Sequence, residues 1–224
     1  MKSLTYACLF RRKVIAEFLM YMAYHLFYLY NMQKSILHQK IITTAGELFY
    51  TNGYHATGVN EIISKCGIAK ATLYSHFKSK EDICIAYLTQ RHEQFMGDLK
   101  NHVKGSKIGK SRLLAIFDYL TDIYRGDSFF GCWALKILGE LSARQERIFS
   151  TIQKHKKELL LYLGELVFEN ASNVSKAEIE RVSGGIYMLY DSAITEAYLH
   201  KNAWPIYLAK TIAPSLFSDL KMKS

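Results

Sequence analysis

The residues of this sequence best suited to chemistry lie between Thr57 and Asp82, and that chemistry is hydrogen bonding to a polyanion. Apolar residues at Ala69, Leu73 and Phe77 recur every fourth position, which predicts a helix with this stripe turned toward a core. The residues left on the outer face are small or carry hydrogen-bonding groups: Lys70, Ala71, Thr72, Tyr74, Ser75 and His76. Such side chains can contact phosphates and base edges, so this helix is a candidate nucleic-acid contact.

A second short helix precedes this one. Val59, Ile62, Ile63 and Cys66 stand at i, i+3, i+4 and i+7, which is one apolar face of a helix about two turns long. Gly67 follows directly, at a position where glycine ends a helix in the left-handed conformation. Two short helices joined by a glycine turn, with hydrogen-bonding groups outside the second, predict a helix-turn-helix.

Flanking helices must hold this pair in place. From Ser35 to Thr51 the sequence predicts a helix that ends at Asn52 and Gly53. Its apolar stripe consists of Ile41, Ile42, Ala45, Leu48 and Phe49. Beyond the pair, Ser79 and Asp82 form a capping box that opens a further helix, expected to run to about Val103.

These residues together resemble a known domain. The matching positions are Phe49, Gly53, Tyr54, Thr57, Val59, Ile62, Gly67, Ile68, Lys70, Thr72, Leu73, Tyr74, His76, Phe77, Ser79, Lys80 and Asp82. In type and spacing they resemble the DNA-binding domain of the TetR/AcrR family of one-component bacterial repressors, over about Lys34 to Arg91. The resemblance implies an all-α chain, with an N-terminal three-helix helix-turn-helix domain and a C-terminal helical domain for ligand binding and dimerisation.

The resemblance also implies which residues meet DNA. They are Thr57, Gly58, Asn60, Lys70, Ala71, Thr72, Tyr74, Ser75, His76 and Lys80. Thr57, Gly58 and Asn60 would meet phosphates at the start of the second helix, and Lys80 would add charge at the start of the fourth. Gly58 departs from the family, which often has Ser or Thr there as a helix cap. Surface packing is the alternative role for Tyr74 and His76.

The remaining chain predicts five helices, because breaks occur at Asp127-Ser128 and at 171–173 and few residues oppose a helix elsewhere. They span about Arg112–Tyr124, Phe130–Leu141, Arg144–Asn170, Ser175–His200 and Ala203–Leu220. The expected domains are a helix-turn-helix domain at 32–80 and an effector-binding and dimerisation domain at 81–224. In the family, the last two helices pair with those of a second copy; closing the monomer core is the alternative.

The resemblance also implies an effector pocket, which we expect among aromatic and apolar residues of this second domain. The candidates are Phe95, Phe117, Tyr119, Trp133, Ile137, Tyr162 and Tyr187. Aromatic residues at helical spacing are more often core, so each has that alternative. Cys132 lies nearby and is interpreted as a buried, inert thiol, with an oxidant-sensing thiol as the alternative.

Residues 1–31 stand apart from these patterns. Arg11, Arg12 and Lys13 precede an apolar run from Val14 to Tyr30, which Glu17 and His25 interrupt. The run is short for a bilayer, which requires about 20 residues. Met32 begins a stretch typical of the family's starts, so 1–31 is interpreted as an extension or misassigned start without a role in the fold. The alternative is a membrane-tethered helical regulator that uses residues 14–30.

Charge and composition exclude several classes of protein. The net charge is +9, which favours a polyanion partner, but residues 32–91 contribute only +3 of it. Four cysteines without a CxxC pair predict neither a disulfide framework nor a zinc site. The 104–111 connector is one residue short of a P-loop and follows no strand. We find no catalytic motif, so the sequence predicts no enzyme, cofactor or metal; an all-α enzyme remains an unsupported alternative.

The resemblance therefore implies a bacterial, cytoplasmic DNA-binding regulator. We expect a homodimeric repressor that binds double-stranded operator DNA and is released by a small apolar or aromatic effector.

Overall fold

The computed structural model describes residues 2–126, 129–142 and 145–223, with side chains for residues 20–22 and from 24 onward within those ranges. The helices in chain order are α1 (Lys2–Asn52), α2 (Val59–Cys66), α3 (Lys70–His76), α4 (Lys80–Lys104), α5 (Lys110–Arg125), α6 (Trp133–Glu140), α7 (Glu146–Asn170), α8 (Lys176–His200), α9 (Trp204–Ile212) and the 3₁₀ helix η1 (Ala213–Phe217). These ranges contain no strand, which confirms the predicted all-α fold.

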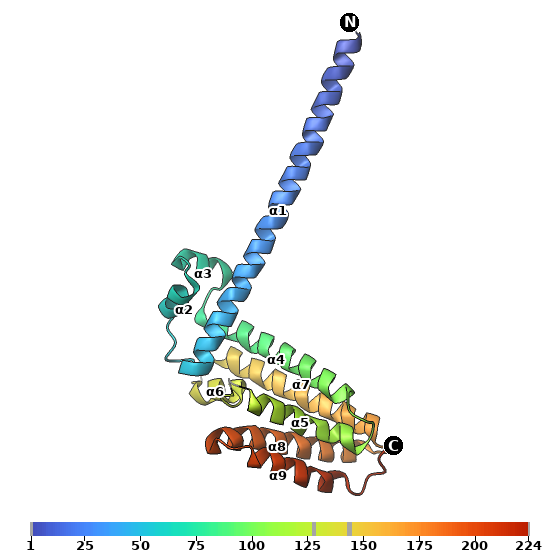
Figure 1. Cartoon of the computed structure of the whole chain (residues 1–224). Helices are drawn as coiled ribbons and strands as arrows, with labels where there is room; N and C mark the ends of the chain where they lie inside the picture. The colour runs from blue at the N-terminus through green and yellow to red at the C-terminus, as the bar shows by residue number, and fades with distance from the viewer. Residues whose placement is uncertain (1, 127–128, 143–144, 224) are drawn as a thin grey trace.

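The first three helices form the N-terminal part, which we call the head. Helices α2 and α3 lie on one side of α1, and α4 leads from them into the rest of the molecule (Figure 1). The predicted stripe of α1 is fully inside, with Ile41, Ala45 and Phe49 all at 0% exposure. Burial of each such large side chain contributes about 1.5–3 kcal/mol, so α1 is the scaffold on which α2 and α3 pack.

Helices α4 to α9 form a bundle, which we call the body (Figure 1). Its helices run side by side, and the hydrophobic core continues from the head into it. At the seam between head and body, a Cβ on Gly46 of α1 would stand 2.2 Å from the buried ring of Tyr87 on α4. The glycine therefore allows these two helices to approach more closely than any larger residue would.

Helix α1 begins well before the predicted Ser35. It is continuous from Lys2, and its N-terminal part projects away from the rest of the molecule (Figure 1). Large apolar side chains on this part are exposed, including Tyr24, Phe27 and Tyr30. Among the described residues, however, no helix combines the length and the apolar character needed to cross a bilayer.

Two sequence expectations about helix limits and faces were wrong. The last helix ends at Ile212 instead of about Leu220, and a 3₁₀ helix that contains Pro214 follows it. Proline has no N–H for the helical ladder and its ring crowds the preceding turn. Ala69 does not join the core stripe of the third helix; it is exposed and serves as the N-cap of α3.

Candidate nucleic-acid interface and body cavity

Helix α3 presents the predicted outer face to solvent. Leu73 is fully buried and Phe77 is 5% exposed, so they anchor the helix to the head. Lys70, Ala71 and Ser75 are exposed, Tyr74 is 45% exposed, and Thr72 and His76 are half-buried. The Ser75 hydroxyl donates to the Thr72 carbonyl at 2.7 Å, which leaves its oxygen lone pairs but not its proton for a partner.

The turn between α2 and α3 has the predicted glycine conformation. Gly67 has φ +65° and ψ +38°, and its N–H contacts the last carbonyls of α2 at Ile63 and Ser64. A residue with a Cβ is disfavoured in this left-handed region, so Gly67 sets the angle between the two helices.

At the start of α2, Gly58 is the N-cap and provides no side-chain hydrogen bond. Gly58 and Asn60 are exposed, in keeping with a position where a phosphate could approach. Thr57 requires a correction. Its side chain is 0% exposed, and its hydroxyl donates to the Gly53 carbonyl at 2.8 Å. The buried Thr57 hydroxyl therefore shapes the loop before α2 and cannot itself reach a phosphate.

Lys80 also differs from expectation. Its ammonium donates to the carbonyls of Tyr54 and Thr57 at 2.9 and 3.2 Å and lies over the Tyr54 ring. Burial lowers the pKa of this amine from its usual value. Because the ammonium donates to two carbonyls of the loop that leads into α2, Lys80 holds that loop, a role that the resemblance did not imply.

A polar junction joins the head to α6. The Glu140 carboxylate, at the end of α6, accepts hydrogen bonds from the backbone N–H groups of Tyr54 and His55 at 3.0 and 2.7 Å. A Cβ on Gly53, which has φ +100°, would lie 2.8 Å from the same carboxylate. The Lys136 ammonium donates to the Tyr50 carbonyl at 2.7 Å. No sequence motif predicts this junction, because its partners lie about 86 residues apart.

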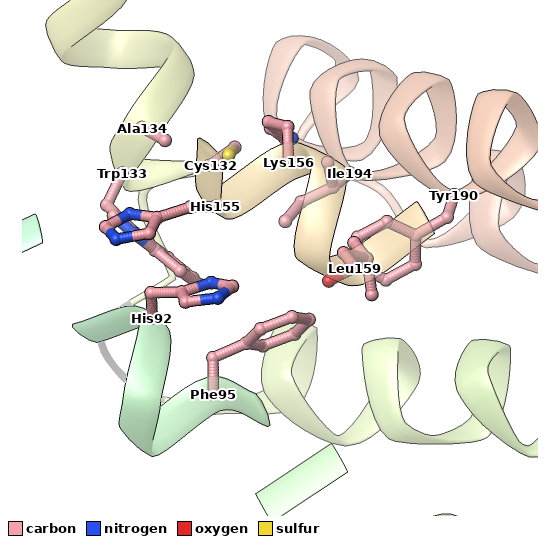
Figure 2. Close-up of a pocket in the computed structure, with 10 residues that line it drawn as sticks. All are labelled: His92, Phe95, Cys132, Trp133, Ala134, His155, Lys156, Leu159, Tyr190 and Ile194. Carbon is pink, nitrogen blue, oxygen red and sulfur yellow. The ribbon is translucent and has the colours of Figure 1, made fainter. Parts of the chain in front are cut away.

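Ten residues of the body line a cavity of about 30 Å³ (Figure 2). They are His92, Phe95, Cys132, Trp133, Ala134, His155, Lys156, Leu159, Tyr190 and Ile194. A water molecule occupies roughly 30 Å³ in the liquid, so this space is far smaller than an aromatic effector. Ligand sites for drug-sized molecules enclose about 300–1,000 Å³, so binding there would require the cavity to open.

Two of the predicted pocket residues, Phe95 and Trp133, line this cavity, with ring centroids 5.5 Å apart. Tyr119 packs behind Phe95 at 5.9 Å. Phe117 and Ile137 are buried core residues outside its lining. Tyr162 lies in a separate groove between α4 and α7, and Tyr187 lies under the Lys156 ammonium at 5.8 Å.

The cavity also contains polar groups that we had not selected from the sequence. The rings of His92 and His155 stack with centroids 4.3 Å apart, as Figure 2 shows, and His92 Nε2 is 2.7 Å from a Glu158 carboxylate oxygen. Burial, together with the His92 charge, lowers the pKa of His155 to about 4. Lys156 forms a largely buried ion pair with Asp191 at 2.5 Å.

The cysteines among the described residues are buried, which makes their thiols unreactive. Cys66, Cys84 and Cys132 are free and buried. Burial raises the pKa of Cys84 to about 12, which makes its reactive thiolate scarce at neutral pH. Within the same residues no cluster of three or more side chains could hold a metal ion.

Comparison with known proteins follows this division into head and body. The family model described as "Bacterial regulatory proteins, tetR family" matches residues 41–87, from the buried part of α1 to the first turns of α4. Residues 41–87 therefore form a TetR-family domain. The family resemblance predicted from residues 34–91 is thereby confirmed.

Curated relatives of this chain are named as transcriptional regulators. The "Fatty acid metabolism regulator protein" of Bacillus subtilis is 30% identical over 116 residues, which cover 52% of this chain and 57% of that protein. The chain thus spans little more than half of that relative. An uncharacterised HTH-type transcriptional regulator of Lactococcus lactis is 26% identical over 71% of this chain and 85% of its own length. The "HTH-type transcriptional activator FasR" of Mycolicibacterium smegmatis is 29% identical over 40% of this chain and 41% of that protein.

Solved structures extend the agreement in fold through the body. A TetR-family transcriptional regulator from Streptomyces coelicolor superimposes with a TM-score of 0.74 over 83% of this chain and 96% of that one, at 22% identity. The reduced form of NemR from Escherichia coli gives a TM-score of 0.69 over 83% and 98%, at 17% identity. The chain therefore shares with these structures the fold of a helix-turn-helix head and a helical body.

Proposed function

We propose that this TetR-family regulator acts in the cytoplasm by binding double-stranded operator DNA through α2 and α3. The observation that carries the proposal is the outer face of α3, where exposed Lys70, Ala71 and Tyr74 surround the buried anchors Leu73 and Phe77. A short helix with this face, set against a second helix by Gly67, has the form that enters a major groove.

Phosphate contacts supply much of the affinity and base contacts the specificity. We assign base contacts to Lys70, which suits guanine, and to Ala71 and Thr72, which suit thymine methyl groups. We assign sugar-phosphate contacts to Tyr74 and His76, and to the exposed backbone at Gly58 and Asn60. Lys80 contributes indirectly, because it holds the loop on which α2 begins.

We further propose that the protein acts as a homodimer through α8 and α9. Both helices carry an apolar stripe on the surface of the single chain. On α8, Met188 and Leu199 are 67% and 68% exposed, and on α9, Trp204 and Leu208 are both 47% exposed. Exposed apolar patches of this kind mark protein interfaces. A monomeric mass in sedimentation equilibrium at micromolar concentration would remove this part of the proposal.

For the effector we propose a small molecule with an apolar or aromatic body that enters the cavity beside Phe95 and Trp133. Cys132, Trp133 and Ala134 line the cavity at the start of α6, and Glu140 holds the Tyr54 and His55 amides at its end. A displacement of α6 by the effector would therefore reach the loop before α2. That route connects the cavity to the DNA-binding helices through one element of eight residues.

We favour repression, because occupation of an operator is sufficient to block transcription, whereas activation requires an additional contact with the transcription machinery. Activation is the other possible direction of regulation, and FasR is a relative named as an activator. A reporter gene under the bound promoter, with and without the regulator, separates the two.

The decisive experiment recovers genomic DNA fragments bound by the purified protein and measures the affinity for one of them. Lys70→Ala should weaken binding to the recovered fragment by at least about fivefold and reduce discrimination against a mismatched site. Lys107→Ala, an exposed lysine in the connector between α4 and α5, is the matched control and should leave both unchanged. If no fragment is enriched, the proposal of an operator-binding regulator is wrong.

The effector proposal has its own test. Compounds that raise the melting temperature of the protein are added to its complex with the recovered fragment. Release of the DNA over the same concentration range as the stabilisation supports the effector role. Stabilisation without release would count against the proposed route through α6.

A further inference from the structure

A groove runs between α1 and α3. None of the residues that the sequence predicts to contact DNA lies on its α1 side. It encloses about 250 Å³ and is lined by Tyr30, Gln33, Lys34 and Leu37 of α1 and by Thr72, Ser75 and His76 of α3. One wall therefore belongs to the helix assigned to the major groove. The other wall belongs to a turn of α1 that begins before residue 32.

Both walls lie in stretches without negative charge. No Asp or Glu occurs between Glu17 and Glu47, or between Glu61 and Glu81. These two stretches nevertheless contain six lysines, among them Lys34 and Lys70. A groove whose walls carry donors and cations but no carboxylate is complementary to a polyanion.

The α1 wall is held firmly against α3. The His38 ring stacks on the Phe77 ring with centroids 4.4 Å apart and an interplanar angle of 18°. His38 also lies 5.8 Å from His76, and burial, together with the charges of His38 and Lys34, lowers the pKa of His76. Among the described residues Lys34 makes no ion pair or side-chain hydrogen bond, and it is exposed. The positive charge of Lys34 is therefore available to a ligand in the groove.

We propose that the α1–α3 groove binds the phosphate backbone of duplex DNA, with Lys34 pairing with a phosphate and Tyr30, Gln33 and Thr72 donating hydrogen bonds beside it. The inference rests on the proposed DNA-binding function and extends its contact surface from α2 and α3 to α1. The occupant is duplex DNA because the groove is continuous with the outer face of α3, so a strand that flanks the major groove passes from one to the other.

A contact to one phosphate has a measurable signature. Each neutralised phosphate contributes about 0.9 to the slope of log affinity against log salt concentration, independently of sequence. The probe is a 30-base-pair duplex pool of random sequence, and the full-length chain is used throughout. Lys34→Ala should reduce the slope by about one and weaken binding roughly five- to tenfold at 0.1 M salt. Lys34→Arg should restore the slope of the unmodified protein.

Lys40→Ala is the matched control, because Lys40 is an exposed lysine of the same helix outside the groove lining. It should leave the slope unchanged. If the unmodified protein binds the duplex pool and Lys34→Ala has an equal slope, the groove lies off the DNA and this inference alone fails. If the unmodified protein shows no salt-dependent binding to any duplex, the proposed function fails with it.

Vesicles of phosphatidylserine and phosphatidylcholine provide the last arm of the experiment. If Lys34→Ala weakens binding to duplex DNA and leaves vesicle binding unchanged, the groove is supported as a DNA contact. If Lys34→Ala instead abolishes vesicle binding and leaves duplex binding intact, the groove faces an anionic lipid surface and the inference is overturned.

Discussion

The outer face of α3 and the cavity of the body differ in how ready they are for a ligand. The α3 face is exposed, and Lys70 and Tyr74 stand on it above the buried Leu73 and Phe77. The body cavity encloses only about 30 Å³, and stacked histidines and a buried ion pair share it with apolar side chains. The head could meet DNA as it stands, whereas the body must rearrange before it admits an effector.

This difference has an energetic consequence. Elements that open to admit a ligand belong to the less stable parts of a protein. A rigid surface binds its partner more tightly, because little conformational entropy is lost on binding. Head and body are nevertheless joined at two places: the close packing of α1 on α4, and the hydrogen bonds of Glu140 to the loop before α2. Variants at the seam, in the cavity and at the start of α2 test whether the two regions behave differently.

The largest effect is expected from Gly46→Ala at the seam. The new Cβ would stand 2.2 and 2.4 Å from two atoms of the Tyr87 ring, which is itself only 5% exposed. Overpacking of this kind costs about 1–3 kcal/mol, and the better helix propensity of alanine offsets up to about 1 kcal/mol of it. Urea denaturation should show a net loss of about 1–2 kcal/mol in the free energy of unfolding.

Gly97→Ala on α4 is the control for Gly46→Ala, because a Cβ at Gly97 would meet nothing within 4 Å. It should raise the free energy of unfolding by about 0.5–1 kcal/mol. Equal behaviour of the two variants would show that α1 and α4 are not packed closely at Gly46. Two separate unfolding transitions in Gly46→Ala would show that the head and body have lost their cooperativity.

The sequence was most informative where contacts are local. The stripes of α1 and α2, the glycine turn at Gly67 and the N-cap at Ser79 depend on residues a few positions apart, and their spacing predicted them. The body helices were also found, because Ser175 and Glu178 signal the start of α8 and few breakers interrupt the others. Pro214 was a signal that should have ended the last helix earlier.

What could not be predicted depends on side chains brought together from distant positions. Lys80 has the sequence position of a phosphate contact, yet its ammonium is bound to two carbonyls of the loop before α2. His92 and His155 are 63 positions apart and carry no motif, so their stacking could be found only in the structure. The same holds for Lys34, which the groove joins to α3.

A loss of similar size is expected from acid at the cavity. The pKa of His155 is lowered from 6.5 to about 4, so the folded protein favours the neutral ring. This contribution to stability is present above pH 6.5 and is lost as the pH falls toward 4, because the unfolded chain binds the proton more readily. Between pH 7 and pH 5 the loss from this residue should be about 1–2 kcal/mol.

His155→Gln removes the titrating group while keeping a polar side chain at the cavity. Urea denaturation at pH 7 and pH 5 should show a smaller decline in stability for this variant than for the unmodified protein. His200→Gln, on the exposed end of α8, is the control and should retain the full decline. If His155→Gln retains it as well, the ring is accessible to solvent and the cavity is already open.

The smallest effect is expected at the start of α2, on the exposed surface of the head. Gly58 caps this helix with φ −86° and ψ 150°, a conformation open to any residue, and a Cβ there would meet nothing within 4 Å. Serine adds the side-chain acceptor that glycine lacks, so Gly58→Ser should raise the free energy of unfolding by a few tenths of a kcal/mol. Gly58→Ala should lower it, because alanine is a poorer cap than either.

If both variants bind a recovered DNA fragment as tightly as the unmodified protein, the phosphate at this position is held by the backbone of α2. Weaker binding by both would instead show that the DNA approaches Gly58 too closely for a side chain, which would make the head a tighter fit than its exposed surface indicates.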